Sequence, residues 1–318
     1  MPSLVILGAG GFLGKAIIAQ KRTFRIKAVA RKIPADVTIN SDKTIWYESD
    51  LLIPKSLDGI LEEDDIVINT AYIESNNEND NLCMIDNIIA ACVQNKVKRL
   101  IHCSTANVVG AAKNLHVDES VICKPTTEYE RVKFLMEQRL LSSRLTNLEM
   151  VILRPTAIVG PGGKNLLKLA NSLINGNKFV NYLRASLFGK RKMNLVPIQN
   201  VVAAILHLST QQEISNGAIY FISSDDDPEN NFFSIEKMLL EALGLRHRKI
   251  PLIPIPRSIL SMMIKFKGRS GEDSSRVYDS NQLIATGYIP EVSLQTAIKE
   301  FGKIMRIKHI TGSLLSDN

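Results

Sequence analysis

Short apolar runs alternate along the first half of the chain with longer segments in which apolar residues recur at helical spacing. The apolar runs are at residues 4–7, 26–30, 66–71, 99–103 and 149–153. The helical segments are at residues 14–20, 80–95 and 129–141. Strands that alternate with helices predict a parallel sheet covered by helices on both faces. The predicted fold class is therefore α/β, with a Rossmann-type doubly wound parallel sheet.

This alternation changes after residue 160, where the segment Gly160-Pro161-Gly162-Gly163 interrupts it. The elements predicted beyond it are a helix at 166–174, a basic loop, a strand at 194–198, a helix at 201–208 and a strand at 218–222. The last ninety or so residues are mixed, and the chain shows no internal repeat.

The change of pattern predicts two domains. We expect residues 1–160 to form the Rossmann-type domain, to which residues 194–224 return. Residues 161–193 and 225–318 are expected to form a smaller C-terminal substrate-binding domain. A chain of 318 residues is long enough for both.

The amino-acid composition and the distribution of charge indicate which classes of protein are excluded. Of the residues, 45% are hydrophobic and 22% are charged, which is typical of a globular protein. The net charge is +7, but Lys and Arg are spread along the chain, with small clusters at 190–192 and 246–249. A nucleic-acid-binding protein concentrates its basic residues on one face, so we expect no nucleic-acid partner. The clusters indicate either a solvated surface or a basic environment for an anionic substrate.

The cysteines and the apolar segments suggest a compartment. Cys83, Cys92, Cys103 and Cys123 form no metal-type pair and are too few for a disulfide framework. Residues 1–8 are typical of a strand and not of a signal peptide. No window reaches about 18 uninterrupted apolar residues, so no stable membrane insertion is expected. These features predict a cytoplasmic protein with reduced thiols.

Three weaker signals receive structural interpretations. The apolar segment 259–266 has basic neighbours, and we favour a packed helix or a subunit interface over a membrane surface. His102 lies on a predicted strand and is expected to be packed there. The run Asp225 to Asp227 is expected to be a solvated turn, because it lacks the glycine and distal glutamate of a calcium loop. No metal site is predicted.

A glycine-rich loop follows the first strand and opens the first helix. Gly8, Gly11 and Gly14 permit a tight turn, let the backbone approach a pyrophosphate, and allow the helix to pack closely on the strand. The helix N-terminus supplies N–H groups and a partial positive charge. The sequence therefore predicts a dinucleotide site at this loop.

The end of the second strand indicates which dinucleotide is bound. An acidic residue there would accept a hydrogen bond from the ribose 2′-hydroxyl of NAD. The strand is instead followed by Arg31 and Lys32, and Arg31 is placed to pair with a 2′-phosphate. We therefore predict NADP as the cofactor, with NAD as the alternative.

A tyrosine and a lysine lie four residues apart on the helix at 129–141. Tyr129 and Lys133 share one helix face, and the lysine ammonium is expected to lower the pKa of the tyrosine. Tyr129 would then act as a general acid or base toward a carbonyl or hydroxyl group. Ser104 and Thr105 follow the strand at 99–103, at the edge of the sheet where ligands bind.

Taken together with Asn69-Thr70-Ala71 and the segment Leu153 to Gly162, these motifs resemble the extended short-chain dehydrogenase/reductase superfamily. Within it the chain resembles the NAD-dependent epimerase/dehydratase family, which acts mainly on nucleotide-diphosphate sugars. The resemblance spans nearly the whole chain. It implies a homodimer by analogy.

The resemblance also implies roles for individual residues. The catalytic set it implies is Thr105, Tyr129, Lys133 and Asn81. The cofactor-binding set is Gly8, Gly10, Gly11, Phe12, Leu13, Gly14, Arg31, Asp50, Leu51, Thr70, Ala71, Tyr72, Lys133 and Pro155, with Asp50 and Leu51 meeting the adenine. The substrate-binding set is Ser104, Thr105, Thr156 and Arg191.

The chain departs from the family pattern at positions that bear on the substrate. Val109 stands where the family often has tyrosine. The family's diphosphate-binding arginine falls near Met193, so that Arg191 or Lys192 would have to serve instead. Thr156-Ala157 replaces the asparagine of the sugar epimerases. The cofactor and proton-transfer predictions do not depend on these positions.

The resulting functional hypothesis is an NADP-dependent reductase or epimerase. It would act on a keto or hydroxyl group of a nucleotide-diphosphate sugar, in polysaccharide assembly by family analogy. Two alternatives stay open. One is an oxidoreductase of a sterol-like or flavonoid-like alcohol or ketone, and the other is a non-catalytic dinucleotide-sensing protein.

Overall fold

The computed structural model describes residues 3–20, 24–35, 40–41, 43–74, 77–143, 147–246 and 275–316. The apolar segment 259–266 and all of the 246–249 cluster except Arg246 lie outside the described residues.

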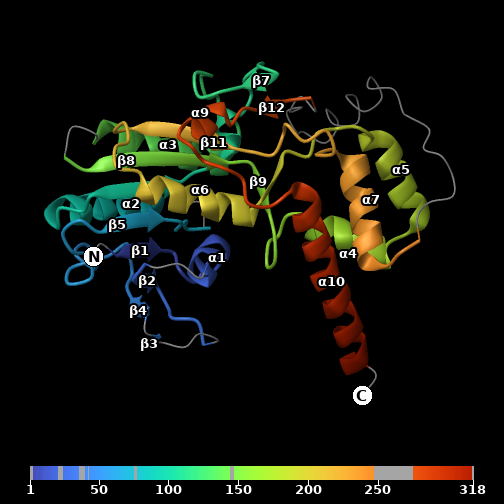
Figure 1. Ribbon diagram of the computed structural model, residues 1–318, viewed down its shortest axis with the longest axis horizontal. Coiled ribbons are helices and arrows are strands. Elements are labelled where there is room, and N and C mark those ends of the chain that lie inside the picture. The colour runs from blue at the N-terminus through green and yellow to red at the C-terminus, as the bar shows by residue number, and fades with distance from the viewer. Residues whose placement is uncertain are drawn as a thin grey trace.

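One eight-stranded sheet organises the first part of the chain (Figure 1). Its strands, in spatial order, are β11 (Ala218–Ile222), β8 (Glu149–Pro155), β6 (Arg99–Cys103), β5 (Ile66–Asn69), β1 (Leu4–Leu7), β2 (Ile26–Ala30), β4 (Thr44–Glu48) and β3 (Asn40–Ser41). All neighbouring pairs are parallel except β3 with β4. The order reverses direction at β1, as in a doubly wound sheet, and the predicted fold class is confirmed.

Helices cover both faces of this sheet. The helices α1 (Phe12–Ala19) and α6 (Ile198–Thr210) pack on one face, and α2 (Glu78–Gln94) and α3 (Glu128–Ser142) pack on the other. The central strands β1, β5 and β6 are buried throughout, because both of their faces are covered. This explains why they are continuous apolar runs in the sequence.

A second hydrophobic core lies beside the sheet, in what we call the helical lobe (Figure 1). Its helices are α4 (Leu167–Asn175), α5 (Lys178–Phe188), α7 (Phe232–Leu243) and α10 (Leu294–Ser316). The parallel pair β9 (Ala157–Val159) and β10 (Leu195–Pro197) leads into it from the sheet. The short elements η1 (Ala106–Val109), β7 (His116–Val117), β12 (Val277–Tyr278) and α9 (Asn281–Ala285) complete the described chain.

Helix α5 corrects the sequence prediction, which expected a basic loop at this point. The helix begins at Asn177, whose side chain accepts hydrogen bonds from the backbone N–H groups of Phe179 and Val180. An asparagine at the N-cap is a recognised helix-start signal. The prediction missed it because the apolar residues of α5 do not form the usual buried stripe.

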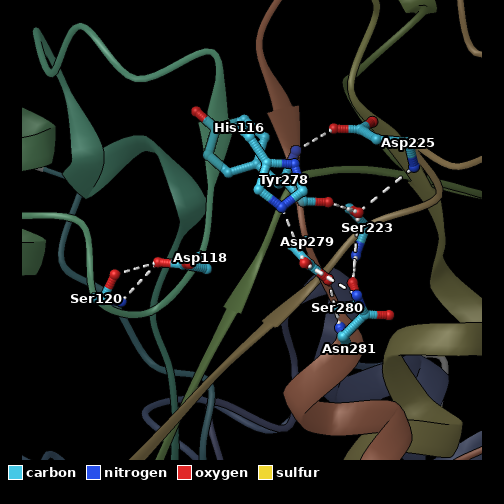
Figure 2. A network of polar contacts seen from close by, with 9 residues as sticks. All are labelled: His116, Asp118, Ser120, Ser223, Asp225, Tyr278, Asp279, Ser280 and Asn281. Carbon is cyan, nitrogen blue, oxygen red and sulfur yellow. Dashed lines mark hydrogen bonds and ion pairs between the residues drawn. The ribbon is translucent and has the colours of Figure 1, made fainter.

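Asp225 corrects a prediction in part: the run Asp225 to Asp227 does form a turn with Asp226 exposed, but Asp225 itself is buried. It is only 2% exposed and accepts hydrogen bonds from three residues, and Figure 2 shows the one from the backbone N–H of Tyr278. One carboxylate oxygen, Oδ2, accepts from Asn194 Nδ2 at 2.6 Å and from the backbone N–H of Tyr278 at 2.9 Å. The other, Oδ1, accepts from Asn230 Nδ2 at 3.0 Å. The carboxylate thus joins the segments before β10 and α7 to β12, and burial raises its pKa to about 6.

The raised pKa of Asp225 predicts how stability depends on pH. The folded protein favours the protonated acid more than the unfolded chain does, so the free energy of unfolding falls as pH rises from about 4 through about 6. The loss amounts to about 3 kcal/mol at neutral pH. In Asp225→Asn this pH-dependent contribution disappears. Urea unfolding at a series of pH values measures it, with the exposed Asp58→Asn as control. A stability difference from wild type that stays constant over this range would contradict the prediction.

Candidate functional site

The glycine loop, residues 8–14, turns the chain sharply away from β1. The backbone N–H groups of Gly8 and Ala9 donate to the carbonyl of Val29 at the end of β2, at 3.1 and 3.0 Å. Gly8 has φ +81°, and a Cβ there would lie 2.8 Å from the nitrogen of Ala71. A Cβ on Gly14 would lie 2.5 Å from the carbonyl oxygen of Gly8. Only glycine fits these two positions, whereas a Cβ on Gly10 would meet its nearest neighbour, Pro34, at 3.4 Å.

The first turn of α1 presents backbone rather than side chains to this loop. Its N-cap is Gly11, which makes no side-chain capping hydrogen bond. Leu13 points into the core, so only its backbone faces the turn. The ring of Phe12 lies against Gly163 of the segment that leads to the helical lobe, 2.9 Å from where a Cβ would be.

These features fit a dinucleotide. N–H groups at the helix start without a side-chain cap, next to glycines that leave the backbone exposed, suit a pyrophosphate. The loop lies at the carboxyl ends of β1 and β2, next to the point where the strand order reverses. Ligands of doubly wound sheets bind at this place.

The segment after β5 is fixed beneath the glycine loop. The Thr70 hydroxyl donates to the carbonyl of Leu7 at 2.9 Å. Asn69 accepts from the N–H of Ala71 at 3.0 Å and donates through Nδ2 to Nδ1 of His102 at 3.1 Å. Burial lowers the pKa of His102, so its ring is neutral and its proton lies on Nε2. His102 is thus a packed residue, as expected, and it helps to place the backbone that carries Tyr72.

Tyr129 lies in the first turn of α3. That turn is closed by a capping box, in which Thr127 and Glu130 bond each other's backbone N–H groups. The hydroxyls of Tyr129 and Thr105 share a hydrogen bond. The Tyr129 ring also meets that of Tyr72 edge to face, with centroids 5.2 Å apart.

The pKa of Tyr129 is opposite in direction to the sequence expectation. Burial raises it to about 12, and the hydrogen bond from Thr105 offsets this only in part. The expected lowering by Lys133 is absent because the ammonium makes other contacts. It donates to the carbonyl of Cys103 at 3.2 Å and lies 4.8 Å from the centroid of the Tyr72 ring. Burial also lowers the pKa of Lys133 itself.

The hydroxyls that follow β6 differ in their contacts. Thr105 accepts from the N–H of Asn107 at 3.2 Å and is bonded to Tyr129, so it stands next to the reactive group. Ser104 Oγ is buried and has no hydrogen-bond partner within the described part of the chain. The Ser104 hydroxyl is therefore free to form a hydrogen bond with a bound molecule.

Asn81 acts on the backbone rather than on the reacting groups. Its Oδ1 accepts from the N–H of Ile73 at 3.1 Å, and its Nδ2 donates to the carbonyls of Ile73 and Asn77 at 3.2 and 3.1 Å. The buried side chain therefore holds the segment that follows Tyr72. We interpret it as a positioning residue.

The sequence prediction gave no role to two buried residues that support the site. Glu137 lies two helical turns beyond Tyr129 on α3 and binds Arg154 of β8 through both carboxylate oxygens, at 3.1 and 2.7 Å. Both side chains are buried.

Pro155 and Thr156 follow Arg154 directly in the chain. Thr156 donates to the carbonyl of Ile222 through its N–H at 3.0 Å and through its hydroxyl at 3.4 Å.

Three further residues that are predicted to bind the cofactor lie at the ends of β2 and β4. Arg31 is exposed and has no hydrogen bond or ion pair to the described residues. Asp50 accepts from the N–H of Leu52 at 3.0 Å. The carbonyl of Leu51 accepts from Asn87 of α2 at 2.9 Å, which fixes this loop beside the strand that precedes Arg31.

Arg191 makes its contacts inside the helical lobe. Its guanidinium lies 5.6 Å from the ring centroid of Phe188, and Lys192 donates to the carbonyl of Asp225 at 2.8 Å. The structure thus gathers the glycine loop, Tyr72, Thr105, Tyr129 and Lys133 into one site, whereas the contacts of Arg191 tie it to α5. Among the described residues no group of His, Cys, Asp or Glu could hold a metal ion.

This site and fold define a class, the extended short-chain dehydrogenase/reductases, which are NAD(P)-dependent oxidoreductases. Residues 5–255 match the sequence model of the 3-beta hydroxysteroid dehydrogenase/isomerase family. The chain belongs to this family, and the predicted superfamily is confirmed.

Curated relatives are similar to the chain at 24–29% identity. Short-chain dehydrogenase/reductase family 42E member 1 of Bos taurus is 29% identical over 68% of this chain and 59% of its own length, so the chain spans about three fifths of that relative. The 2-alkyl-3-oxoalkanoate reductase of Stenotrophomonas maltophilia is 28% identical over 70% of this chain and 71% of its own. A decarboxylating sterol-4-alpha-carboxylate 3-dehydrogenase of Candida albicans is 24% identical over 71% of each.

Solved structures share the fold over nearly the whole chain. UDP-glucose 4-epimerase of Thermotoga maritima, solved with UDP-glucose, is 17% identical, with a TM-score of 0.73 over 96% of this chain and 99% of that one. RMD from Pseudomonas aeruginosa, complexed with NADPH, is 20% identical, with a TM-score of 0.66 over 96% and 98%. At these identities the likeness shows the fold alone.

Among the helices in the described ranges, none is both long and apolar enough to cross a membrane.

The contact between Tyr72 and Lys133 yields a prediction. An aromatic ring next to an ammonium stabilises its charged form, so Tyr72→Leu should lower the pKa of Lys133 further. Activity should then decline at lower pH on the alkaline side, and turnover should fall by about tenfold. Tyr72→Phe keeps the ring and is expected to behave like wild type. The pH profile of kcat measures both variants, and identical profiles for Leu and Phe would contradict the prediction.

Proposed function

We propose that this protein is an NAD(P)-dependent oxidoreductase that interconverts a hydroxyl and a keto group on a largely apolar small molecule, such as a sterol. The observation that carries the proposal is the hydrogen-bonded pair of Thr105 and Tyr129, with Lys133 one helical turn away, beside the glycine loop. These groups supply proton transfer where a dinucleotide would supply the hydride.

The protonation of Tyr129 favours reduction of a ketone. With a pKa raised to about 12, the phenol keeps its proton throughout the neutral range. It gives that proton to the substrate oxygen while Thr105 holds the oxygen in place. The phenolate that remains then takes a proton from water, while the ammonium of Lys133 holds the carbonyl of Cys103 and the ring of Tyr72 in place beside it. The glycine loop would hold NAD(P)H, which would supply the hydride that, together with this proton, converts the ketone to the alcohol.

Two observations favour an apolar substrate over the nucleotide-diphosphate sugar of the sequence hypothesis. The cations expected to hold a diphosphate are engaged within the lobe, Arg191 on Phe188 and Lys192 on the carbonyl of Asp225. The relatives named above act on a sterol and on an oxoalkanoate, both with an oxygen function at carbon 3. The substrates in both names also carry a carboxylate, so a keto acid belongs among the compounds to be tested.

The helical lobe is proposed as the substrate-binding domain, built from residues 161–193 and 225–318. It meets the cofactor loop through the contact of Phe12 with Gly163. Its core is apolar, and the sheet domain, residues 1–160 with 194–224, holds the reacting groups.

A substrate panel tests the proposal. Oxidation of NADPH is followed with a 3-keto steroid, a 2-alkyl-3-oxo acid and a UDP-keto sugar. We expect turnover of one or both of the apolar ketones. Turnover of the sugar nucleotide alone would contradict the apolar substrate while preserving the oxidoreductase, and binding of NADPH without turnover of any ketone would support a dinucleotide sensor.

Removing the phenol tests the proton donor. Tyr129→Phe should lower turnover by roughly 10²–10⁴, because the variant lacks the phenol that is the proposed proton donor. Binding of NADPH, measured by fluorescence titration, should be retained. Tyr47→Phe on β4 serves as the matched control, and near-normal activity of Tyr129→Phe would refute the assignment.

The exposed Arg31 supports NADP as the preferred cofactor. A charged hydrogen bond contributes roughly 1.5–3 kcal/mol, so Arg31→Ala should raise KM for NADPH by about 10- to 100-fold. KM for NADH should change little, because NADH has no 2′-phosphate. Lys32→Ala is the matched control. A wild-type preference for NADH would overturn the assignment.

A further inference from the structure

Helix α5 buries Ala185 in the core of the lobe but exposes apolar residues in its first half, which a normal surface helix does not. Phe179, Val180 and Leu183 are 67%, 49% and 39% exposed and lie on its outer side. We call these three residues the α5 patch. The inner side of the same helix buries Asn181, which is only 6% exposed. A surface helix ordinarily places its apolar residues inward and its polar residues outward.

Polar contacts hold α5 in this orientation. Asn181 Nδ2 donates to the carbonyl of Ser172 on α4 at 2.6 Å, and Asn181 Oδ1 accepts from the Ser172 hydroxyl at 2.7 Å. Arg184 Nη1 also donates to Ser172 Oγ at 2.9 Å. Rotating the helix to bury the α5 patch would break these bonds. The outward apolar face is therefore built into the packing of α4 and α5.

All the charged residues in the chain segment that carries the patch are cationic. Residues 161–193 contain seven Lys and Arg residues, and no Asp or Glu. The exposed cations among them are Lys164, Lys168, Lys178 and Lys190. Of these four, Lys164 forms an ion pair, with the exposed Glu74 at 3.3 Å. An apolar face within such a segment is complementary to a surface that is apolar inside and anionic outside.

We propose that the α5 patch docks the protein on an anionic lipid surface. Apolar side chains that enter the headgroup boundary, next to cations that meet anionic headgroups, are the two components of interfacial binding. A second copy of the chain fits less well. It would bring the same seven cations together, and three side chains are far fewer than the 20–30 residues a side of a stable interface.

The first test is sedimentation of the full chain with vesicles. We expect binding to phosphatidylcholine vesicles that contain phosphatidylserine, little binding to phosphatidylcholine alone, and weakening by salt. The double variant Lys178→Glu/Lys190→Glu should bind at least about 25-fold more weakly, since each lost cation contributes roughly fivefold. Phe179→Ser/Leu183→Ser should also lose binding. The matched controls are Ile289→Ser, at an apolar residue equally exposed elsewhere, and Lys113→Glu.

The second test locates the contact. The chain has one tryptophan, Trp46, which is buried on β4. Phe179→Trp adds a second one in the patch. Vesicles that contain brominated lipid should quench the added emission and leave that of Trp46 unchanged. This readout does not require any of the destabilising changes of the first test.

The results of these tests distinguish a lipid surface from a second copy of the chain as the partner of the α5 patch. Equal binding to both vesicle types, binding that survives both double variants, or no quenching of Trp at 179 would each overturn the proposal. So would a dimer in light scattering that Phe179→Ser/Leu183→Ser converts to a monomer, because the patch would then bind a second copy. None of these measurements depends on the proposed substrate, so a failure here leaves the oxidoreductase assignment untouched.

Discussion

The buried ion pair between Glu137 and Arg154 connects α3 to the sheet. Glu137 shares α3 with Tyr129 and Lys133, and Arg154 lies on β8, next to the strand that ends before Thr105. The two charges are out of water and satisfy each other through two hydrogen bonds. Removing one partner of such a pair costs about 3–5 kcal/mol, because the other charge stays buried alone. The spacing of Tyr129 from Thr105 therefore depends on a contact two helical turns away.

Burial also sets the chemistry of the reacting groups. It raises the pKa of Tyr129 and lowers that of Lys133, so each is shifted toward its uncharged form. A neutral phenol is a proton donor, and burial makes the charge of Lys133 more dependent on the groups around it. The same low-polarity surroundings also keep His102 neutral, so that it accepts from Asn69. The site thus owes its reactivity to enclosure as much as to the presence of its residues.

The sequence predicted the sheet, the glycine loop and the shared helix face of Tyr129 and Lys133, because these depend on local pattern. Gly14 lies against the carbonyl of Gly8, Gly8 itself has a positive φ, and Tyr129 and Lys133 are one helical turn apart. It did not predict the direction of the Tyr129 pKa, which depends on how completely the lobe and sheet exclude water. It also missed the role of Asp225, whose partners Asn194 and Tyr278 are 31 and 53 residues away. Helix α5 was missed because its outer face is apolar.

The ring of Phe12 touches Gly163, and this contact has a consequence for how the two halves of the molecule communicate. Phe12 belongs to the first turn of α1, the turn that faces the glycine loop, while Gly163 begins the path into the helical lobe. Ordering one of these segments restricts the other through a rigid aromatic ring. In thermodynamic terms the two sites are linked. If a ligand of the loop changes the affinity of the lobe for its own ligand by some factor, the ligand of the lobe changes the affinity of the loop by the same factor.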